Sequence, residues 1–157
     1  MERELLVRKI REGTVIDHIP AGKALTVLKI LGLTGEEGFT IAIVMNVESK
    51  KLGKKDIVKI EGKFLKPSEV DKIALIAPTA TINIVRNYEV VTKRRVEVPN
   101  EIVNILKCIN PNCITNRSGE PVSRLFKVIS KKPLKLVCKY CDEMMTEEDV
   151  VKQLAAT

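Results

Sequence analysis

The four cysteines of this 157-residue chain form two closely spaced pairs. The first pair follows the pattern C-x4-C and the second C-x2-C, with 24 residues between them. Each short spacing lets the chain turn back so that two sulfurs face one ion, and a hairpin between the pairs brings the two halves together. The spacing therefore predicts one metal ion bound by Cys108, Cys113, Cys138 and Cys141.

The cysteine pattern favours zinc in a structural role. Two disulfides, or four unrelated buried thiols, fit the paired spacing less well, and the charged N-terminal stretch MERELLVRKIREG does not resemble a secretory signal. An iron–sulfur cluster also uses four thiolates, but the two-plus-two arrangement is typical of zinc knuckles. Because four thiolates leave no open position for a reacting water, we expect one structural Zn²⁺ per chain.

The only histidine of the chain, His18, follows Asp17 at the end of a β-like run. Without a second histidine the chain offers little for acid–base or nucleophilic catalysis, so we interpret His18 as a structural or ligand-binding group. The sequences GxGxxG and GxxxxGK[ST], which cradle phosphates in many nucleotide-binding proteins, are absent. Any phosphate must therefore be met by single cations such as Lys59 and Lys93.

The first hundred residues contain the alternating and helical patterns of an α+β domain. From residue 14 onward the predicted order is β-α-β-β-α-β, which is typical of the ferredoxin-like split βαβ fold, an antiparallel sheet with two helices on one face. The predicted strands are 5–10, 14–19, 39–48, 56–60, 81–85 and 88–92, and the predicted helices are 21–31 and 67–77.

A charged, proline-containing stretch at residues 93–100 marks the predicted domain boundary. We place an N-terminal domain at residues 1–98 and a C-terminal domain at residues 99–157. A segment as short as the second is marginal for an unaided hydrophobic core, so a metal is expected to stabilise it. We predict a small all-β, zinc-ribbon-like domain there.

The net charge of +7, from 27 Lys and Arg against 20 Asp and Glu, leaves two alternatives open. A zinc-ribbon protein that binds nucleic acid or the ribosome is one, but aromatic residues make up only 3% of the chain and acidic residues are interspersed. A small metal-dependent enzyme centred on Asp17 and His18 is the other, and it lacks an open metal position or a second base. No apolar run approaches the ~18–20 residues of a membrane span. We expect a cytoplasmic protein without nucleic-acid or membrane partners.

Two further motifs make the sequence more specific. Residues 13–21, GTVIDHIPA, and residues 87–91, NYEVV, together with the cysteine spacing, resemble the regulatory chain of aspartate carbamoyltransferase. The resemblance implies a non-catalytic subunit of pyrimidine biosynthesis that binds CTP as inhibitor and ATP as activator. It also implies a zinc domain that docks on the catalytic chain, and a regulatory homodimer in an assembly of catalytic trimers and regulatory dimers.

The same resemblance implies a nucleotide site between the first strands and the NYEVV strand. Asp17 is expected to bind the ribose, and Lys59 the ribose or a nearby phosphate. His18 and Lys93 are expected to bind the triphosphate. The remaining implied contacts are backbone groups at the base edge, from Val7, Arg8, Lys9, Ile10, Ile57, Tyr88 and Val90, and the residues Asn83 and Val85 at the phosphate end.

Overall fold

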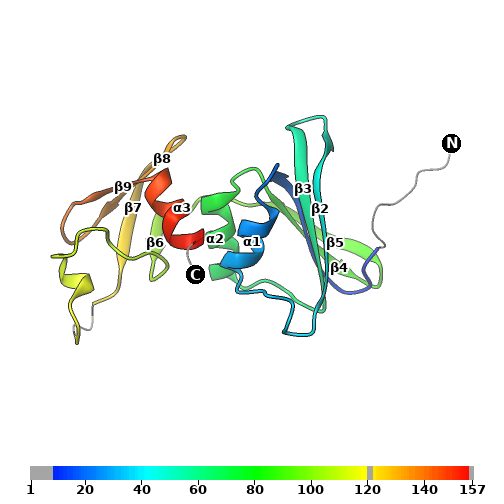
Figure 1. The fold of residues 1–157 in the computed structure, drawn as a ribbon, viewed down its shortest axis with the longest axis horizontal. Coiled ribbons are helices and arrows are strands. Elements are labelled where there is room, and N and C mark those ends of the chain that lie inside the picture. Colours follow the sequence, from blue (N-terminus) through cyan, green and yellow to red (C-terminus); the bar gives the residue numbers. More distant parts are fainter. Residues whose placement is uncertain (1–8, 120–121, 156–157) are drawn as a thin grey trace. The chain divides into compact units, whose positions relative to one another are not determined.

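The computed structural model describes residues 9–119 and 122–155. The chain forms two compact units, one up to Glu97 and the other from Val98 (Figure 1). Most of the strand predicted at residues 5–10 lies outside the described residues, and Lys9 and Ile10 belong to no regular element.

The first unit is a five-stranded antiparallel sheet with two helices. Its strand order, β2-β3-β1-β4-β5, places each strand beside antiparallel neighbours, so the first four strands have the split βαβ arrangement and β5 adds an edge. The predicted α+β fold is confirmed. The elements are β1 (Gly13–Pro20), α1 (Ala24–Ile30), β2 (Thr40–Ser49), β3 (Gly53–Glu61), α2 (Pro67–Ile76), β4 (Thr81–Arg86) and β5 (Glu89–Arg95).

The core of this unit lies between the sheet and the two helices, which cover one face (Figure 1). Ile16 on β1 pairs with Val58 on β3 and with Ile82 on β4, and all three side chains are buried. Val27 of α1 and Ile73 of α2 are fully buried as well. Because side chains alternate along a strand, the neighbouring row points to the opposite face, which the helices leave open.

Helix α1 begins at Ala24, three residues later than the sequence predicts, because Asp56 on β3 fixes the preceding turn. The fully buried Asp56 carboxylate accepts backbone hydrogen bonds from Gly22 (2.8 Å) and Ala24 (2.9 Å) through Oδ2. Its Oδ1 accepts a third, from Asn46 on β2 (2.9 Å). A buried carboxylate is tolerated when donors surround it in this way.

The second unit is a four-stranded antiparallel sheet in the order β6-β7-β8-β9. Its core is built around Phe126, Leu136, Met145 and Val150, all at most 1% exposed. The elements are β6 (Glu101–Val103), the 3₁₀ helix η1 (Ile114–Asn116), β7 (Leu125–Lys131), β8 (Leu134–Cys138), β9 (Met144–Thr146) and α3 (Glu147–Ala155).

Helix α3 is an addition to the β-domain that the sequence predicts. It begins with a reciprocal cap, in which the Thr146 backbone N–H donates to the Asp149 carboxylate (2.9 Å) and the Asp149 N–H donates to the Thr146 hydroxyl (3.4 Å). Its buried residue, Val150, joins the core of the sheet. Within the described ranges, no helix has both the length and the apolar character needed to cross a membrane.

Candidate functional site

The fold of the second unit brings the four cysteine sulfurs together. All four Sγ atoms lie within 4.8 Å of one another, and three of the residues are buried while Cys141 is partly exposed. Cys138 ends β8, Cys141 lies in the turn that follows it, and Cys113 directly precedes η1. Cys108 lies in the segment after β6, outside any helix or strand.

The sulfur spacing fits a single four-coordinate metal ion. Cys108 Sγ lies 3.5 Å from Cys141 Sγ, and Cys113 Sγ lies 3.7 Å from Cys138 Sγ. Zinc–sulfur bonds of about 2.3 Å in a tetrahedron separate the sulfurs by roughly 3.8 Å, whereas a disulfide requires about 2.05 Å. All four cysteines are free. The donor set is closed, because four thiolates complete a tetrahedral ion and leave no position for water.

Local turns bring the two members of each cysteine pair together. In the first pair, the Cys113 N–H donates to the Asn110 carbonyl (3.0 Å), and the Asn112 N–H donates to the Asn110 side chain (3.0 Å). In the second, the Asp142 N–H donates to the Cys138 carbonyl (3.0 Å), and Asp142 has a φ of 61°. Asparagine and aspartate tolerate such turn geometry, which explains their places between and beside the cysteines.

The thiols of Cys108, Cys113 and Cys138 differ in acidity. Burial raises the pKa of Cys108 and of Cys138. Burial acts in the same direction on Cys113, but hydrogen bonds with Thr115, Cys138 and Cys141 oppose it, and the net effect lowers the pKa of Cys113 to about 7. The Thr115 hydroxyl lies 3.1 Å from Cys113 Sγ. A metal must displace the protons that remain, so binding is coupled to pH.

In the first unit, strand register places Lys59, Asn83 and Lys93 in one row. Lys59 on β3 pairs with Val15 on β1, Val15 pairs with Asn83 on β4, and Asn83 pairs with Lys93 on β5. Directly paired residues project from the same face of a sheet, and this row alternates with the buried row at Ile16. The three polar side chains therefore lie on the open face.

A second row of the same face contains Asp17, Thr81 and Arg95. Asp17 pairs with Thr81, and Thr81 pairs with Arg95. Each of these residues is two positions along its strand from the Val15–Asn83–Lys93 row, so it projects in the same direction. The Asp17 carboxylate forms a 2.9 Å ion pair with Lys55 on the neighbouring strand.

A β-bulge turns His18 toward this open face. The pairing of β1 with β3 shifts between Ile16 and Ile19, and His18 has a φ of 57°. The His18 backbone N–H donates to Asp17 Oδ1 (2.6 Å), and its ring Nδ1 lies 3.2 Å from the Thr81 hydroxyl. In regular alternation Asp17 and His18 would point to opposite faces, but the bulge brings both to one site.

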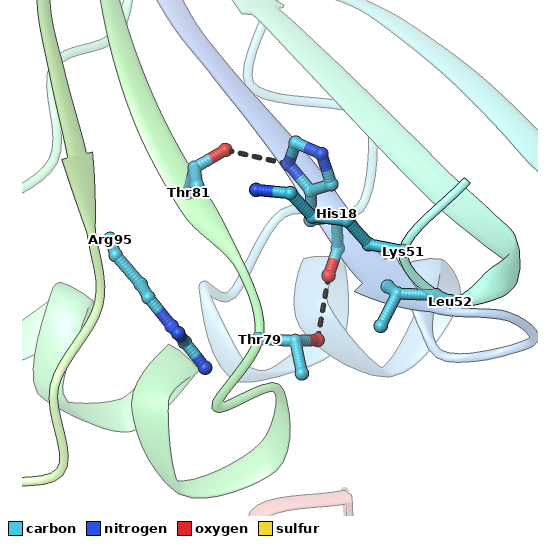
Figure 2. A pocket seen from close by; sticks show the side chains of 6 residues that line it. All are labelled: His18, Lys51, Leu52, Thr79, Thr81 and Arg95. Carbon is cyan, nitrogen blue, oxygen red and sulfur yellow. Dashed lines mark hydrogen bonds between the residues drawn. The ribbon is translucent and has the colours of Figure 1, made fainter. Parts of the chain in front are cut away.

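Two hollows lie on the open face at different levels of the sheet. The smaller, of about 170 Å³, includes His18, Thr81 and Arg95 (Figure 2). The larger, of about 620 Å³, includes Lys59 and Tyr88. Among the described residues, the smaller hollow is lined by His18, Lys51, Leu52, Thr79, Thr81 and Arg95. The described residues that line the larger hollow are Lys9, Ile10, Thr40, Ala42, Lys59, Glu61 and Tyr88.

Figure 2 shows the side chains that line the smaller hollow and the hydrogen bonds between them. The Thr79 hydroxyl donates to the His18 carbonyl (2.8 Å), and the Thr81 hydroxyl lies within hydrogen-bond distance of the His18 ring. Two threonines thus hold the backbone and the ring of His18 in place. Burial lowers the pKa of His18, and the partly opposing charge of Asp17 does not restore it because Lys55, Lys51 and Lys93 lower it further. Lys51 and Arg95 also line this hollow, so it offers cationic groups to an anion.

The structure brings together most of the residues that the sequence predicts for a nucleotide site. Lys9, Ile10, Lys59 and Tyr88 line the larger hollow, and His18 lines the smaller. Asp17, Asn83 and Lys93 lie in the two rows between β1 and β5. Ile57 lies two residues from Lys59 on β3, Val85 is buried on β4, Val90 is exposed on β5, and Val7 and Arg8 lie outside the described residues.

Lys51 and Arg95 line the smaller hollow but were missed in the sequence. Arg95 lies two residues beyond Lys93, so the two-residue period of a strand could have placed both on one face. Lys51 lies in the turn between β2 and β3, and its approach to His18 depends on how that hairpin folds back. A local sequence pattern does not encode this approach.

Together the two units define a class of chain that joins an α+β domain with a cationic open face to a small metal-binding domain. Residues 5–97 match the family model of the aspartate carbamoyltransferase regulatory chain, allosteric domain, and residues 100–151 match its metal binding domain. The chain belongs to the family of aspartate carbamoyltransferase regulatory chains. The resemblance seen in the sequence motifs is thereby confirmed.

Similar regulatory chains match over nearly their whole length. The aspartate carbamoyltransferase regulatory chain of Thermofilum pendens is 66% identical over 156 residues, which cover 99% of this chain and 98% of the relative. That of Hyperthermus butylicus is 67% identical over 151 residues, 96% of this chain and 94% of the relative. This chain is therefore a regulatory, non-catalytic component of pyrimidine biosynthesis that associates with catalytic chains.

Proposed function

We propose that the allosteric domain binds CTP and ATP across the open face of its sheet. The observation that carries this proposal is the row of Lys59, Asn83 and Lys93 together with two hollows on the same face, one of which includes Lys59. Lys59 on β3 and Lys93 on β5 are three strand spacings apart, about 14 Å at roughly 4.8 Å each. The two lysines are therefore suited to different parts of one elongated anion.

The two hollows suit different ends of the nucleotide. The smaller hollow, with His18, Lys51 and Arg95, takes the triphosphate, because its cationic side chains favour negative charge. The larger hollow, with Ile10 and Tyr88, takes the base against apolar and aromatic surface. Asp17 and Lys59 then bind the ribose between them.

This arrangement modifies one role implied by the resemblance. Val85 was expected at the phosphate end together with Asn83. On β4, however, Asn83 lies between Val85 and Thr81, and Thr81 belongs to the smaller hollow. We therefore assign Val85 to the base half of the site and keep Asn83 at the centre.

The metal of the second unit is, in our proposal, one structural Zn²⁺ held by Cys108, Cys113, Cys138 and Cys141. The sulfur spacing and the closed donor set support zinc, whose chemistry here is to tie together a domain with a small core. We propose that residues 99–157 dock on the catalytic chain. Exposed apolar side chains around the site support a docking role, among them Val103, Ile109, Ile114, Tyr140 and Met144.

Membership of the family supports a proposal for the wider assembly. We propose that residues 1–98 form the nucleotide-binding allosteric domain and that the chain forms a homodimer. Regulatory dimers would bridge catalytic trimers in the cytoplasm, and a nucleotide would act by binding the two global states of that assembly with different affinities.

Reconstitution with an aspartate carbamoyltransferase catalytic chain tests this function. We expect the two chains to copurify, and we expect CTP and ATP to change the catalytic activity of the complex but not that of the catalytic chain alone. Activity that ignores both nucleotides in a complex of the correct composition would refute the effector assignment. Failure to copurify would refute the docking role.

A further inference from the structure

One asparagine side chain connects the parts of the first cysteine pair. Asn116, the last residue of η1, donates from Nδ2 to the Cys108 carbonyl (2.9 Å) and to the Asn110 carbonyl (2.8 Å). The amide orientation follows from chemistry, because the reverse assignment would set its oxygen against two carbonyl oxygens. The Asn116 backbone N–H also donates to the Cys113 carbonyl (2.9 Å). One residue thus contacts both cysteines of the pair and the turn between them.

A glutamine from α3 holds the residue before this loop. The Lys107 backbone N–H donates to Gln153 Oε1 (2.8 Å), and Gln153 Nε2 donates to the Lys107 carbonyl. The side chain amide thereby satisfies both backbone groups of Lys107, as a neighbouring strand would. These bonds join residues 46 positions apart in the sequence.

Cys108 depends on these contacts more than the other cysteines do. Cys138 is held by the ladder of β8, Cys113 by η1, and Cys141 by the tight turn after Cys138. Cys108 belongs to no helix or strand, and its backbone carbonyl is bound by the Asn116 side chain. We propose that Asn116 and Gln153 are positioning residues of the metal site, which hold the Lys107–Asn110 backbone so that Cys108 faces the other three thiols.

The physical effect of such positioning is on the lifetime of the bound metal. A preorganised ligand recaptures the ion after a bond breaks, whereas a loose loop lets Cys108 move away. Outer contacts of this kind typically change metal affinity by about 10–100-fold. The inference rests on the four-cysteine site proposed above, and it adds that α3 stabilises this site from the far end of the domain sequence.

The test measures zinc transfer from the full-length chain to a chromogenic chelator at fixed pH. Asn116→Ala and Asn116→Asp remove both donated bonds, so we expect zinc release to become roughly tenfold faster. Gln153→Ala removes two bonds, while Gln153→Glu keeps the acceptor for the Lys107 N–H and should have the smaller effect. Ser130→Ala is the matched control, because it removes one side chain–backbone bond (2.6 Å, to the Pro133 carbonyl) at the β7–β8 turn of the same unit.

A spectroscopic measurement separates positioning from general destabilisation. With Co²⁺ in place of zinc, the Asn116 variants should shift the thiolate charge-transfer and d–d bands, and Ser130→Ala should not. Wild-type release rates and spectra in the Asn116 and Gln153 variants would overturn the inference while leaving the metal site intact. A wild-type chain that retains no zinc would instead refute the site itself. If the Asn116 variants fail to fold, the Gln153 pair decides between these outcomes.

Discussion

Lys59 and Lys93 lie in one row across the sheet, on β3 and β5, with Val15 and Asn83 paired between them. No phosphate-cradling loop occurs in the sequence, so the proposed nucleotide site depends on single cations placed by strand register. Register is strongly determined here, because a shift of one residue on any of these strands would turn the lysines toward the helices and the core residues toward solvent. In the proposed site, effector binding therefore depends directly on the strand register of the fold.

Lys93→Ala should weaken CTP and ATP alike, since both carry the triphosphate that Lys93 is proposed to bind. A lost charge-assisted contact costs about 1.5–3 kcal/mol, so we expect affinities lower by roughly tenfold or more. Titration calorimetry measures this, and zinc content should stay unchanged. Lys29→Ala is the control, because Lys29 is an exposed residue of α1 on the other face of the sheet. Wild-type affinity for both nucleotides in Lys93→Ala would contradict the site assignment.

Arg95→Ala tests which end of the site receives the phosphates. Arg95 lines the smaller hollow with His18, so its loss should weaken CTP by about tenfold and leave CMP, which lacks the outer phosphates, nearly unaffected. Arg94→Ala provides a matched control, because Arg94 pairs with the buried Ile82 row and projects from the opposite face. Equal losses for CTP and CMP in Arg95→Ala would place the phosphates elsewhere.

The features that could be predicted from the sequence are those encoded over a few neighbouring residues. Alternation of apolar residues predicts the strands, and the C-x4-C and C-x2-C spacing predicts the cluster of four cysteines. The reciprocal cap of α3 is also visible as Thr146-x-x-Asp149, yet the expectation of an all-β domain obscured it. By contrast, the bulge that turns His18 depends on how β1 pairs with β3. The role of Asp56 likewise depends on contacts distant in sequence, because its carboxylate on β3 accepts hydrogen bonds from the turn before α1 and from β2.

Nucleotide binding should strengthen as the pH falls through the range where His18 titrates. In the free protein the pKa of His18 is lowered, chiefly by burial, so the ring is neutral near pH 7. A bound triphosphate adds negative charge beside the ring and raises its pKa, so binding takes up a proton. The gain in nucleotide affinity begins as the pH falls below the pKa of His18 in the complex. It levels off once the pH is below the pKa of His18 in the free protein.

His18→Gln isolates this effect. The terminal phosphate of the nucleotide titrates near pH 6 as well, but it contributes equally to both proteins. The ratio of wild-type to variant affinity, measured by calorimetry from about pH 5 to pH 8, should therefore rise as the pH falls. A ratio of wild-type to variant affinity that does not change with pH would show that His18 does not contact the phosphates.

Removal of the metal should unfold the second unit and spare the first. The second unit, residues 98–157, is short for an unaided hydrophobic core. A metal that binds only the folded state contributes its binding free energy to folding, about 10–16 kcal/mol for structural zinc. A strong chelator should therefore make residues of the β7–β8 hairpin accessible to protease and abolish association with the catalytic chain. CTP binding should persist, because Lys59, Asn83 and Lys93 lie on a sheet that is stabilised by a separate core around Ile16. Cys138→Ser should reproduce the effect of the chelator, while Ser130→Ala serves as the control in the same hairpin. Simultaneous loss of CTP binding on chelation would show instead that the two units fold as one.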